Sequence, residues 1–361
     1  MELFFADNVL ANRRPFILNN EMKWVLEINH FLNSISQENG KTASSHTSRA
    51  YGYHLLDWLT YSEAFQIDWK RVSYRHLIHY RNELANQVSA LTKRPLKRET
   101  INLRLGMICN FYKFLVKHNY ISGLPFELEQ VFVRRPFEAD EMAHLRAFRR
   151  SNLNPLMYRT HERSIEVPNN PDVRKFIRGF HSWRNRLLAE LMWLTGLRRS
   201  EACALTVFVI PENLNSIETD YSVVRIRGKG AKDRQVKFPL RLLRSIDRYI
   251  NTERRMLLKR SGSKTDFIWV SHKGLPIKPS AINKAFEANH KRTGIRINPH
   301  SLRHSYAVNR LQYLQDRNVK SALKILQGEL GHSSLQTTQI YLHETDLMRA
   351  EAAAEHSGEG S

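Results

Sequence analysis

Apolar residues recur at helical spacing through the first third of the chain. From Met22 to about Leu124 they return every three or four positions, the repeat of a helix that buries one face. The repeat is clearest in three stretches, at residues 24–32, 51–59 and 103–115. This pattern predicts an all-helical domain over residues 20–125.

The periodicity then fades until about residue 180. Four prolines interrupt this part, at positions 136, 155, 168 and 171, and polar residues surround them. Prolines break helices and fit poorly into central strands. We therefore predict a linker over 126–180 with short structured pieces.

The second half of the chain has a mixed pattern. A helical repeat over 182–194 stops at Gly196, and alternating stretches at 223–227 and 234–238 flank a glycine-rich turn, which predicts a β-hairpin. A helix over 240–258, a short strand at 267–270, and helices near 280, 300 and 319 follow. We expect a mixed α+β domain at 181–350 and an acidic tail at 351–361, in a chain that is mainly α with a small sheet.

Charge narrows the choice of partner. The 361 residues include 56 Lys and Arg against 35 Asp and Glu, for a formal net charge of +21. An enzyme of small neutral metabolites needs no such field, whereas a protein that sits on a polyphosphate gains affinity and association rate from it. With 42% hydrophobic residues the chain can also bury real cores, which argues against a disordered basic tail.

Composition also bears on the compartment. The chain has two cysteines, Cys109 and Cys203, far apart and without metal-ligand spacing, which fits a reducing compartment. The start of the chain lacks a signal-peptide pattern, and no stretch approaches the ~18 apolar residues of a membrane span. We expect a cytoplasmic, nucleoid-associated protein with no membrane contact.

Basic residues gather in two places. One group lies just before the helical repeat at 103–115 and the other lies on the predicted hairpin, and both are candidate DNA contacts. A solvated loop and a hairpin edge protected by cations are the alternative interpretations. The candidates are Lys93, Arg94, Lys97 and Arg98 in the first group and Arg225, Arg227, Lys232 and Arg234 in the second.

Four separate motifs in the second half carry candidate chemistry. Each has a structural alternative when taken alone, such as a surface ion pair or a packed tyrosine. The motifs are Gly196-Leu197-Arg198 with Glu201, Lys229 between two glycines at the hairpin turn, His300 with Arg303 three residues later, and Leu330-Gly331-His332 followed by Tyr341.

Together these motifs resemble the tyrosine site-specific recombinases, the family of phage and transposon integrases. The resemblance implies an N-terminal core-binding, SAM-like helical domain and a catalytic domain that holds Arg198, Lys229, His300, Arg303, His332 and the nucleophile Tyr341, with Glu201 in support. It also implies cleavage of double-stranded DNA through a 3′-phosphotyrosine and a Holliday junction, without metal, cofactor or ATP. A homotetramer on synapsed sites, with the C-terminal segment docked on a neighbour, completes the implied picture.

The residue types suit that reaction. Arg198 and Arg303 can neutralise a phosphate, His332 can add a hydrogen bond, His300 is the expected base for Tyr341, and Lys229 is the expected acid for the leaving oxygen. Alternatives are a type IB topoisomerase-like enzyme, a non-catalytic DNA-binding protein of the same fold, and a metal nuclease using the histidines. The last lacks the carboxylate and cysteine ligands that such sites usually have.

Overall fold

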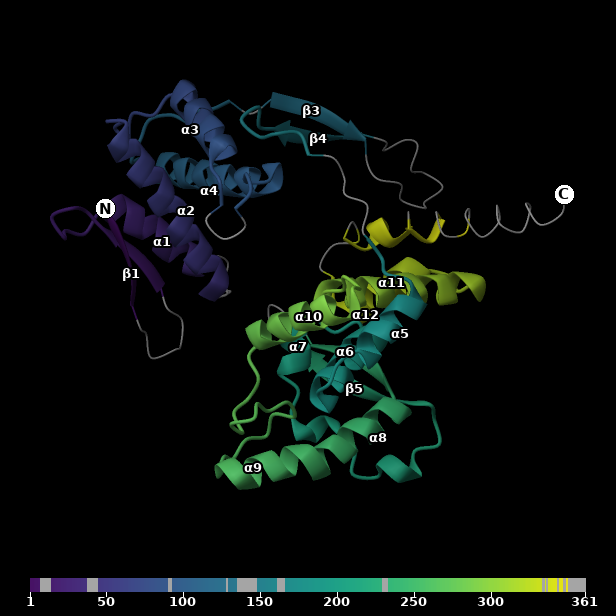
Figure 1. Cartoon of the computed structure of the whole chain (residues 1–361). Coiled ribbons are helices and arrows are strands. Elements are labelled where there is room, and N and C mark those ends of the chain that lie inside the picture. The colour runs from purple at the N-terminus through teal and green to yellow at the C-terminus, as the bar shows by residue number, and fades with distance from the viewer. Residues whose placement is uncertain are drawn as a thin grey trace. The chain divides into compact units, whose positions relative to one another are not determined.

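The computed structural model divides the chain into two compact units, Met1–Glu162 and Arg163–Ser361. The structure describes residues 1–6, 14–37, 45–89, 93–127, 129–134, 148–160, 166–228, 233–332, 335, 337–342, 344–346 and 349. Helices dominate both units, and the strands of the described parts form two-stranded antiparallel sheets (Figure 1). The predicted fold class, mainly α with a small sheet, is confirmed.

The first unit is built around four helices, coloured purple to blue in Figure 1. The last of them supplies a fully buried face, with Leu105, Ile108, Phe111 and Leu115 at the centre of the core beside Trp58. These positions follow the three- and four-residue repeat of the sequence, so burial of one helix face accounts for the element. The helices are α1 (Leu26–Gln37), α2 (Ser45–Ala64), α3 (Tyr74–Asn86) and α4 (Arg98–Lys117).

An N-terminal hairpin that the sequence pattern did not predict precedes these helices. Strand β1 (Glu2–Ala6) pairs antiparallel with β2 (Arg14–Leu18). The hairpin is tied to α1 because the buried side chain of Asn29 bonds both backbone groups of Ile17, at 2.8 Å each. The first unit therefore begins before residue 20.

The stretch 126–180, predicted as a linker, contains three regular elements. Strand β3 (Glu129–Arg134) pairs with β4 (Phe148–Leu153), and helix α5 (Asn170–Arg178) follows. Helix α5 begins at the N-cap Asn169, and its residues Val173 and Phe176 are fully buried in the core of the second unit. This helix is part of the second unit's core.

The second unit packs around helix α6, which contacts α11, α8 and the β6 strand. Leu187, Leu188, Leu191 and Met192 of α6 are buried, and the helix ends at Gly196 in the left-handed conformation (φ +63°). The elements are α6 (Trp183–Thr195), α7 (Arg199–Cys203), β5 (Tyr221–Arg227), β6 (Asp233–Pro239), α8 (Leu240–Tyr249), a π-helical segment (Ile250–Arg254), α9 (Arg255–Ser261), α10 (Pro279–Thr293), α11 (Pro299–Asp316) and α12 (Ala322–Leu330), with short 3-10 turns at Val207–Val209 and Leu214–Ser216.

The hairpin predicted at 223–238 is confirmed. Strands β5 and β6 pair so that Val224 lies opposite Val236 and Ile226 opposite Arg234. The inward positions alternate with exposed ones, as expected of a strand with one face on the core. The strand expected at 267–270 does not form; Phe267 and Val270 make only isolated bridges to Thr206 and Pro276.

Two properties concern the described chain as a whole. None of its helices combines the length and the apolar composition needed to cross a membrane. Its two cysteines are both free and buried, Cys109 in the first unit and Cys203 in the second. Burial raises the pKa of each thiol to about 11, so both are held as neutral side chains near pH 7.

Candidate active site

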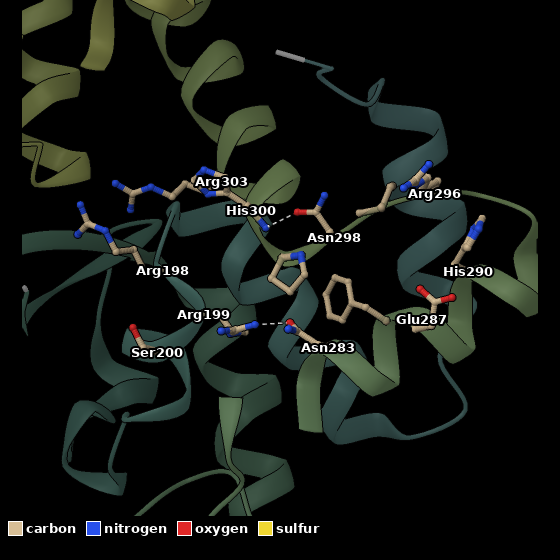
Figure 2. Close-up of a pocket in the computed structure, with 13 residues that line it drawn as sticks. Arg198, Arg199, Ser200, Asn283, Glu287, His290, Arg296, Asn298, His300 and Arg303 are labelled. Carbon is tan, nitrogen blue, oxygen red and sulfur yellow. Dashed lines mark hydrogen bonds between the residues drawn. The ribbon is translucent and has the colours of Figure 1, made fainter. Parts of the chain in front are cut away.

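A cavity of about 670 Å³ opens in the second unit between the start of α7, helix α10 and the start of α11. Figure 2 shows Arg198, His300 and Arg303 on one side of it, and His290 and Arg296 on the other. Arg199 of α7 bonds Asn283 of α10 across the wall. Three residues of the proposed catalytic set therefore line one cavity.

The first turn of α11 sets two of these side chains. Asn298 caps the helix, with its side-chain oxygen accepting hydrogen bonds from the backbone N–H of His300 (2.8 Å) and Ser301 (3.0 Å). Pro299 occupies the first helical position, which suits its fixed φ. His300 and Arg303, three residues apart, lie on the same helix face and both line the cavity.

A buried carboxylate holds the arginine at the start of α7. Glu201 accepts from the backbone N–H (2.8 Å) and from Nη1 (2.9 Å) of Arg198. It also accepts two bonds from Arg234 of β6, at 2.9 and 2.7 Å. Burial alone would raise the pKa of Glu201, but these hydrogen bonds and charges outweigh it and hold the pKa below its ordinary value. The carboxylate therefore stays charged between two guanidinium groups.

Arg234 differs from the other cations of the hairpin. Sequence reasoning groups it with the DNA contacts, but its side chain is only 7% exposed and its guanidinium faces Glu201 inside the protein. The strand alternation contains the signal for this, because Arg234 is in phase with the inward residues Val236 and Phe238. Its charge is thus engaged within the site.

Three arginines meet the C-terminal end of α12. Arg234 Nε donates to the carbonyl of Glu329 (3.0 Å), Arg303 Nη2 to that of Leu330 (2.7 Å), and Arg198 Nη2 to that of Gly331 (3.1 Å). The last carbonyls of a helix lack partners within the helix and carry its partial negative charge. Three consecutive carbonyls therefore dock the arginines directly before His332.

Arg303 is almost completely buried, at 1% exposure. Besides Leu330, it donates to the carbonyl of Gly196 at the end of α6 (2.6 Å). Burial, with the nearby charge of Arg198, lowers its pKa to about 10, which still leaves it cationic at neutral pH. Two of its five N–H donors are used by these carbonyls, so others remain for a ligand in the cavity.

Tyr341 lies beside this group, buried at 1% exposure. Its hydroxyl is 2.9 Å from Nδ1 of His304, one helical turn after His300. Burial raises its pKa to about 12, although Arg303 and Arg198 oppose that rise. A pKa this high favours the protonated hydroxyl near pH 7. Tyr341 is not among the residues that line the cavity.

The three histidines of this site, His300, His304 and His332, all have lowered pKa values, which favours their neutral forms near pH 7. Burial, followed by the charges of Arg303 and Arg198, lowers the pKa of His300 and lowers that of His332 to about 4. His304 also falls to about 4, through burial and then the influence of His300 and Arg303. His332 is oriented by a contact of 3.0 Å between its Nδ1 and Thr338 Oγ1. Neutral imidazoles can each accept one proton or hydrogen bond.

His304 is the residue of this site that sequence reasoning missed as a contact of the nucleophile. The usable signal was the four-residue spacing from His300, which places both rings on one helix face. Their centroids are 4.2 Å apart, and the ring of His304 also contacts that of Tyr341. The sequence alone could not show that Tyr341 would lie beside the later of the two histidines.

The other predicted residues have varied positions. Lys229 and Lys232 lie outside the described residues, as does the acidic tail at 351–361. Arg225 and Arg227 are exposed on β5. In the first unit Lys93, Arg94, Lys97 and Arg98 are exposed before and at the start of α4, and the guanidinium of Arg98 lies over the ring of Tyr158.

Within the described parts of the chain, no group of three or more His, Cys, Asp or Glu side chains is arranged to hold a metal ion. The polar groups that line the cavity are mainly cationic or neutral nitrogen donors, with Glu287 as the carboxylate among them. Such a set suits an anion.

Profiles of known protein families match both units of the chain. The profile of the "Phage integrase family" matches residues 171–348, and that of the "Phage integrase, N-terminal SAM-like domain" matches residues 28–119. Tyrosine recombinase XerC of Lacticaseibacillus casei is 29% identical over 267 residues, covering 73% of this chain and 78% of the relative. XerC of Halalkalibacterium halodurans is 28% identical over 311 residues, covering 84% and 89%.

Solved structures share the fold. XerH recombinase bound to palindromic difH substrate, in a post-cleavage complex, aligns over 93% of this chain and 89% of its own, with a TM-score of 0.61 and 21% identity. The Tn1549 transposon integrase in complex with circular intermediate DNA aligns over 86% and 94%, with a TM-score of 0.57 and 15% identity.

The fold and the matched profiles define an enzyme that cuts and rejoins DNA strands. The two profiles together span about three quarters of the sequence, in the order helical domain and then catalytic domain. The chain belongs to the phage integrase family of tyrosine recombinases.

Proposed function

We propose that this chain is a site-specific DNA recombinase that cleaves and rejoins double-stranded DNA through a 3′-phosphotyrosine at Tyr341, without metal or ATP. The observation that carries the proposal is the convergence of Arg198, His300 and Arg303 on one cavity next to the buried Tyr341. Two guanidinium groups can neutralise the non-bridging oxygens of one phosphate, which is the largest requirement of the reaction.

The chemical step is a transesterification. The Tyr341 hydroxyl gives its proton to a neighbouring neutral imidazole as its oxygen forms a bond to phosphorus. The bond from phosphorus to the 5′ oxygen breaks, and Lys229 gives that oxygen a proton. His300, which lines the cavity, and His332 donate hydrogen bonds to oxygens of the phosphate. Because the phosphoester energy is kept in the phosphotyrosine, a 5′-hydroxyl from a partner strand can reseal the DNA, and strand exchange passes through a Holliday junction.

We assign double-stranded recombination sites as the partner and a homotetramer on two synapsed sites as the active assembly. The net charge of +21 and the exposed cations Arg225 and Arg227 support DNA binding. Lys93, Arg94, Lys97, Arg98 and Lys232 complete the proposed DNA contacts, and Glu201 and Arg234 support Arg198 from within. We place the reaction in the cytoplasm, on the nucleoid.

Covalent capture tests this proposal and finds the target site in the same experiment. The protein is incubated with EDTA and a library of nicked duplexes made from the genome that encodes it. Adducts that survive denaturation are isolated and their DNA is sequenced. We expect an adduct at a defined sequence that disappears in Tyr341→Phe and persists in Tyr313→Phe, which removes an exposed hydroxyl from the same unit.

Other outcomes identify the alternatives. Strict dependence on a divalent metal, or DNA binding without any adduct, would overturn the proposal in favour of a nuclease or a non-catalytic binder. Adducts at the expected tyrosine that only relax supercoiled plasmid, with no joining to a second duplex, would indicate a topoisomerase-like activity.

A further inference from the structure

The nucleophile has one hydrogen-bonded side-chain partner among the described residues. The hydroxyl of Tyr341 is 2.9 Å from Nδ1 of His304, while the ring of His300 contacts that of His304 at a tilt of 59° and lines the cavity. His332 lies parallel to Tyr341 at 6.4 Å between ring centroids, and its own Nδ1 is taken by Thr338. The contact with the hydroxyl belongs to the second histidine of α11.

We propose that His304 is a catalytic residue of this site and receives the hydroxyl proton of Tyr341 during cleavage. This role rests on the proposed function and names the base for it. The O–H bond of Tyr341 breaks and an N–H bond forms on Nδ1 of His304, as the tyrosine oxygen bonds to phosphorus. The bond between phosphorus and the 5′ oxygen breaks, its electron pair goes to the 5′ oxygen, and this oxygen takes a proton from Lys229. Rejoining runs the same transfers in reverse.

The hydrogen-bond geometry already fits this transfer. A general base has to lie about 2.6–3.2 Å from the atom it deprotonates. A neutral imidazole has one ring nitrogen without a proton, and the contact with a protonated phenol places that nitrogen at Nδ1. His300 is placed differently, beside Arg303 on the cavity wall, where a phosphate oxygen would lie.

The charges around His304 explain how DNA would switch the base on. The groups that face it are His300 and Arg303 from its own helix and His332 and Tyr341 from the C-terminal segment. Arg198, from the start of α7, acts on Tyr341. Arg303 disfavours an imidazolium ion at His304 as long as no anion balances its charge. A phosphodiester bound at Arg303 and Arg198 would cancel that field and raise the proton affinity of His304. The base would then be weak in the free enzyme and stronger on its substrate.

The test measures single-turnover cleavage of the captured nicked duplex by His304→Gln and by His304→Asn. Asparagine keeps an acceptor near the Nδ1 position but takes up no proton, so it separates hydrogen bonding from proton transfer. We expect both variants to cleave about 100-fold or more slowly than the parent, the usual size of a lost general base. Thermal unfolding of each variant reports whether the unit is folded.

Two chemical substitutions assign the defect to the proton of Tyr341. Replacing Tyr341 with 3,5-difluorotyrosine lowers the pKa of the phenol, so cleavage depends less on a base. The replacement should raise the cleavage rate of His304→Gln at least tenfold more than it raises the rate of the parent. A 5′-bridging sulfur in the DNA removes the need for an acid and should restore Lys229→Ala, but not His304→Gln. A restored rate also shows that the variant site is folded.

Three results would overturn the role of His304. One is cleavage by both variants within about threefold of the parent rate. Another is that difluorotyrosine restores the cleavage rate of His300→Gln but not that of His304→Gln, which would identify His300 as the base. The third is rescue of His304→Gln by the bridging sulfur, which would make His304 part of the acid. Failure of the unsubstituted chain to form any adduct would instead overturn the proposed function itself, and this role with it.

Discussion

Replacing Glu201 with glutamine removes the negative charge that Arg198 and Arg234 share. The carboxylate is 5% exposed and the side chain of Arg234 is 7% exposed, so water cannot take over the lost partner. Breaking a buried ion pair by removal of one member costs about 3–5 kcal/mol, because the other charge stays buried. We expect Glu201→Gln to lose a free energy of unfolding of that size.

Two other pairs of the same unit provide a graded control. Glu329 pairs with Arg310 at 19% and 22% exposure, and Asp316 pairs with Arg349 at 58% and 42%. Since exposed pairs contribute only about 0–1 kcal/mol, Asp316→Asn should be nearly neutral. Glu329→Gln should fall between Asp316→Asn and Glu201→Gln.

Calorimetry of the second unit's transition measures the series. For a unit of this size, each kcal/mol shifts the midpoint by about 2–4 °C, so Glu201→Gln should lower it by roughly 6–20 °C. The double variant Glu201→Leu with Arg234→Met removes both charges and should recover most of that loss. Equal midpoints for Glu201→Gln and Asp316→Asn, or a double variant less stable than the single one, would refute the reasoning.

Three further outcomes follow from local geometry, each measured by urea unfolding. Asn298→Ala removes the cap of α11 and should cost about 0.5–2 kcal/mol, whereas Asn298→Asp should be almost neutral. Gly331→Ala should lower the free energy of unfolding by at least about 1–2 kcal/mol, because φ is +66° and the new Cβ would lie 2.9 Å from Arg234 Cδ. Gly328→Ala, in open space within α12, should instead raise it by about 0.5–1 kcal/mol. The pKa of Glu201 is lowered in the folded state, so the carboxylate's contribution to the free energy of unfolding is complete above pH ~4.5 and is lost as pH falls through the folded-state pKa. In Glu201→Gln the free energy of unfolding should therefore depend less on pH below about 4.5.

The sequence predicted the helices and the hairpin well because each has a strong local cause. The repeat of α4, the left-handed stop at Gly196 and the alternation around Val224 and Val236 are all short-range features. The N-terminal hairpin lacked such a signal, since its strands have five residues each and their turn cues are weak. Helix α5 was hidden by the prolines around it, although Pro171 near its start is compatible with a first turn.

The candidate site also has a part that local pattern could predict and a part that it could not. The motifs singled out Arg198, His300 and Arg303, and the structure places all three at one cavity. Each of these motifs is a local feature within one or two turns of its element. The inward position of Arg234 and the contact between His304 and Tyr341 depend on how separate elements pack. Local pattern carries no direct information on contacts between residues 33 or 37 positions apart.

The three carbonyls at the end of α12 have a consequence for the order in which the protein is made. Arg198, Arg234 and Arg303 leave the ribosome before Glu329, Leu330 and Gly331, to which they donate. At the roughly 5–20 residues per second of translation, the last of these arginines waits a few seconds for its acceptor. His332 and Tyr341 emerge only after that. A nascent chain therefore contains every arginine of the site before it contains the nucleophile. When Tyr341 is added, the carbonyls that bind these arginines have already been synthesised.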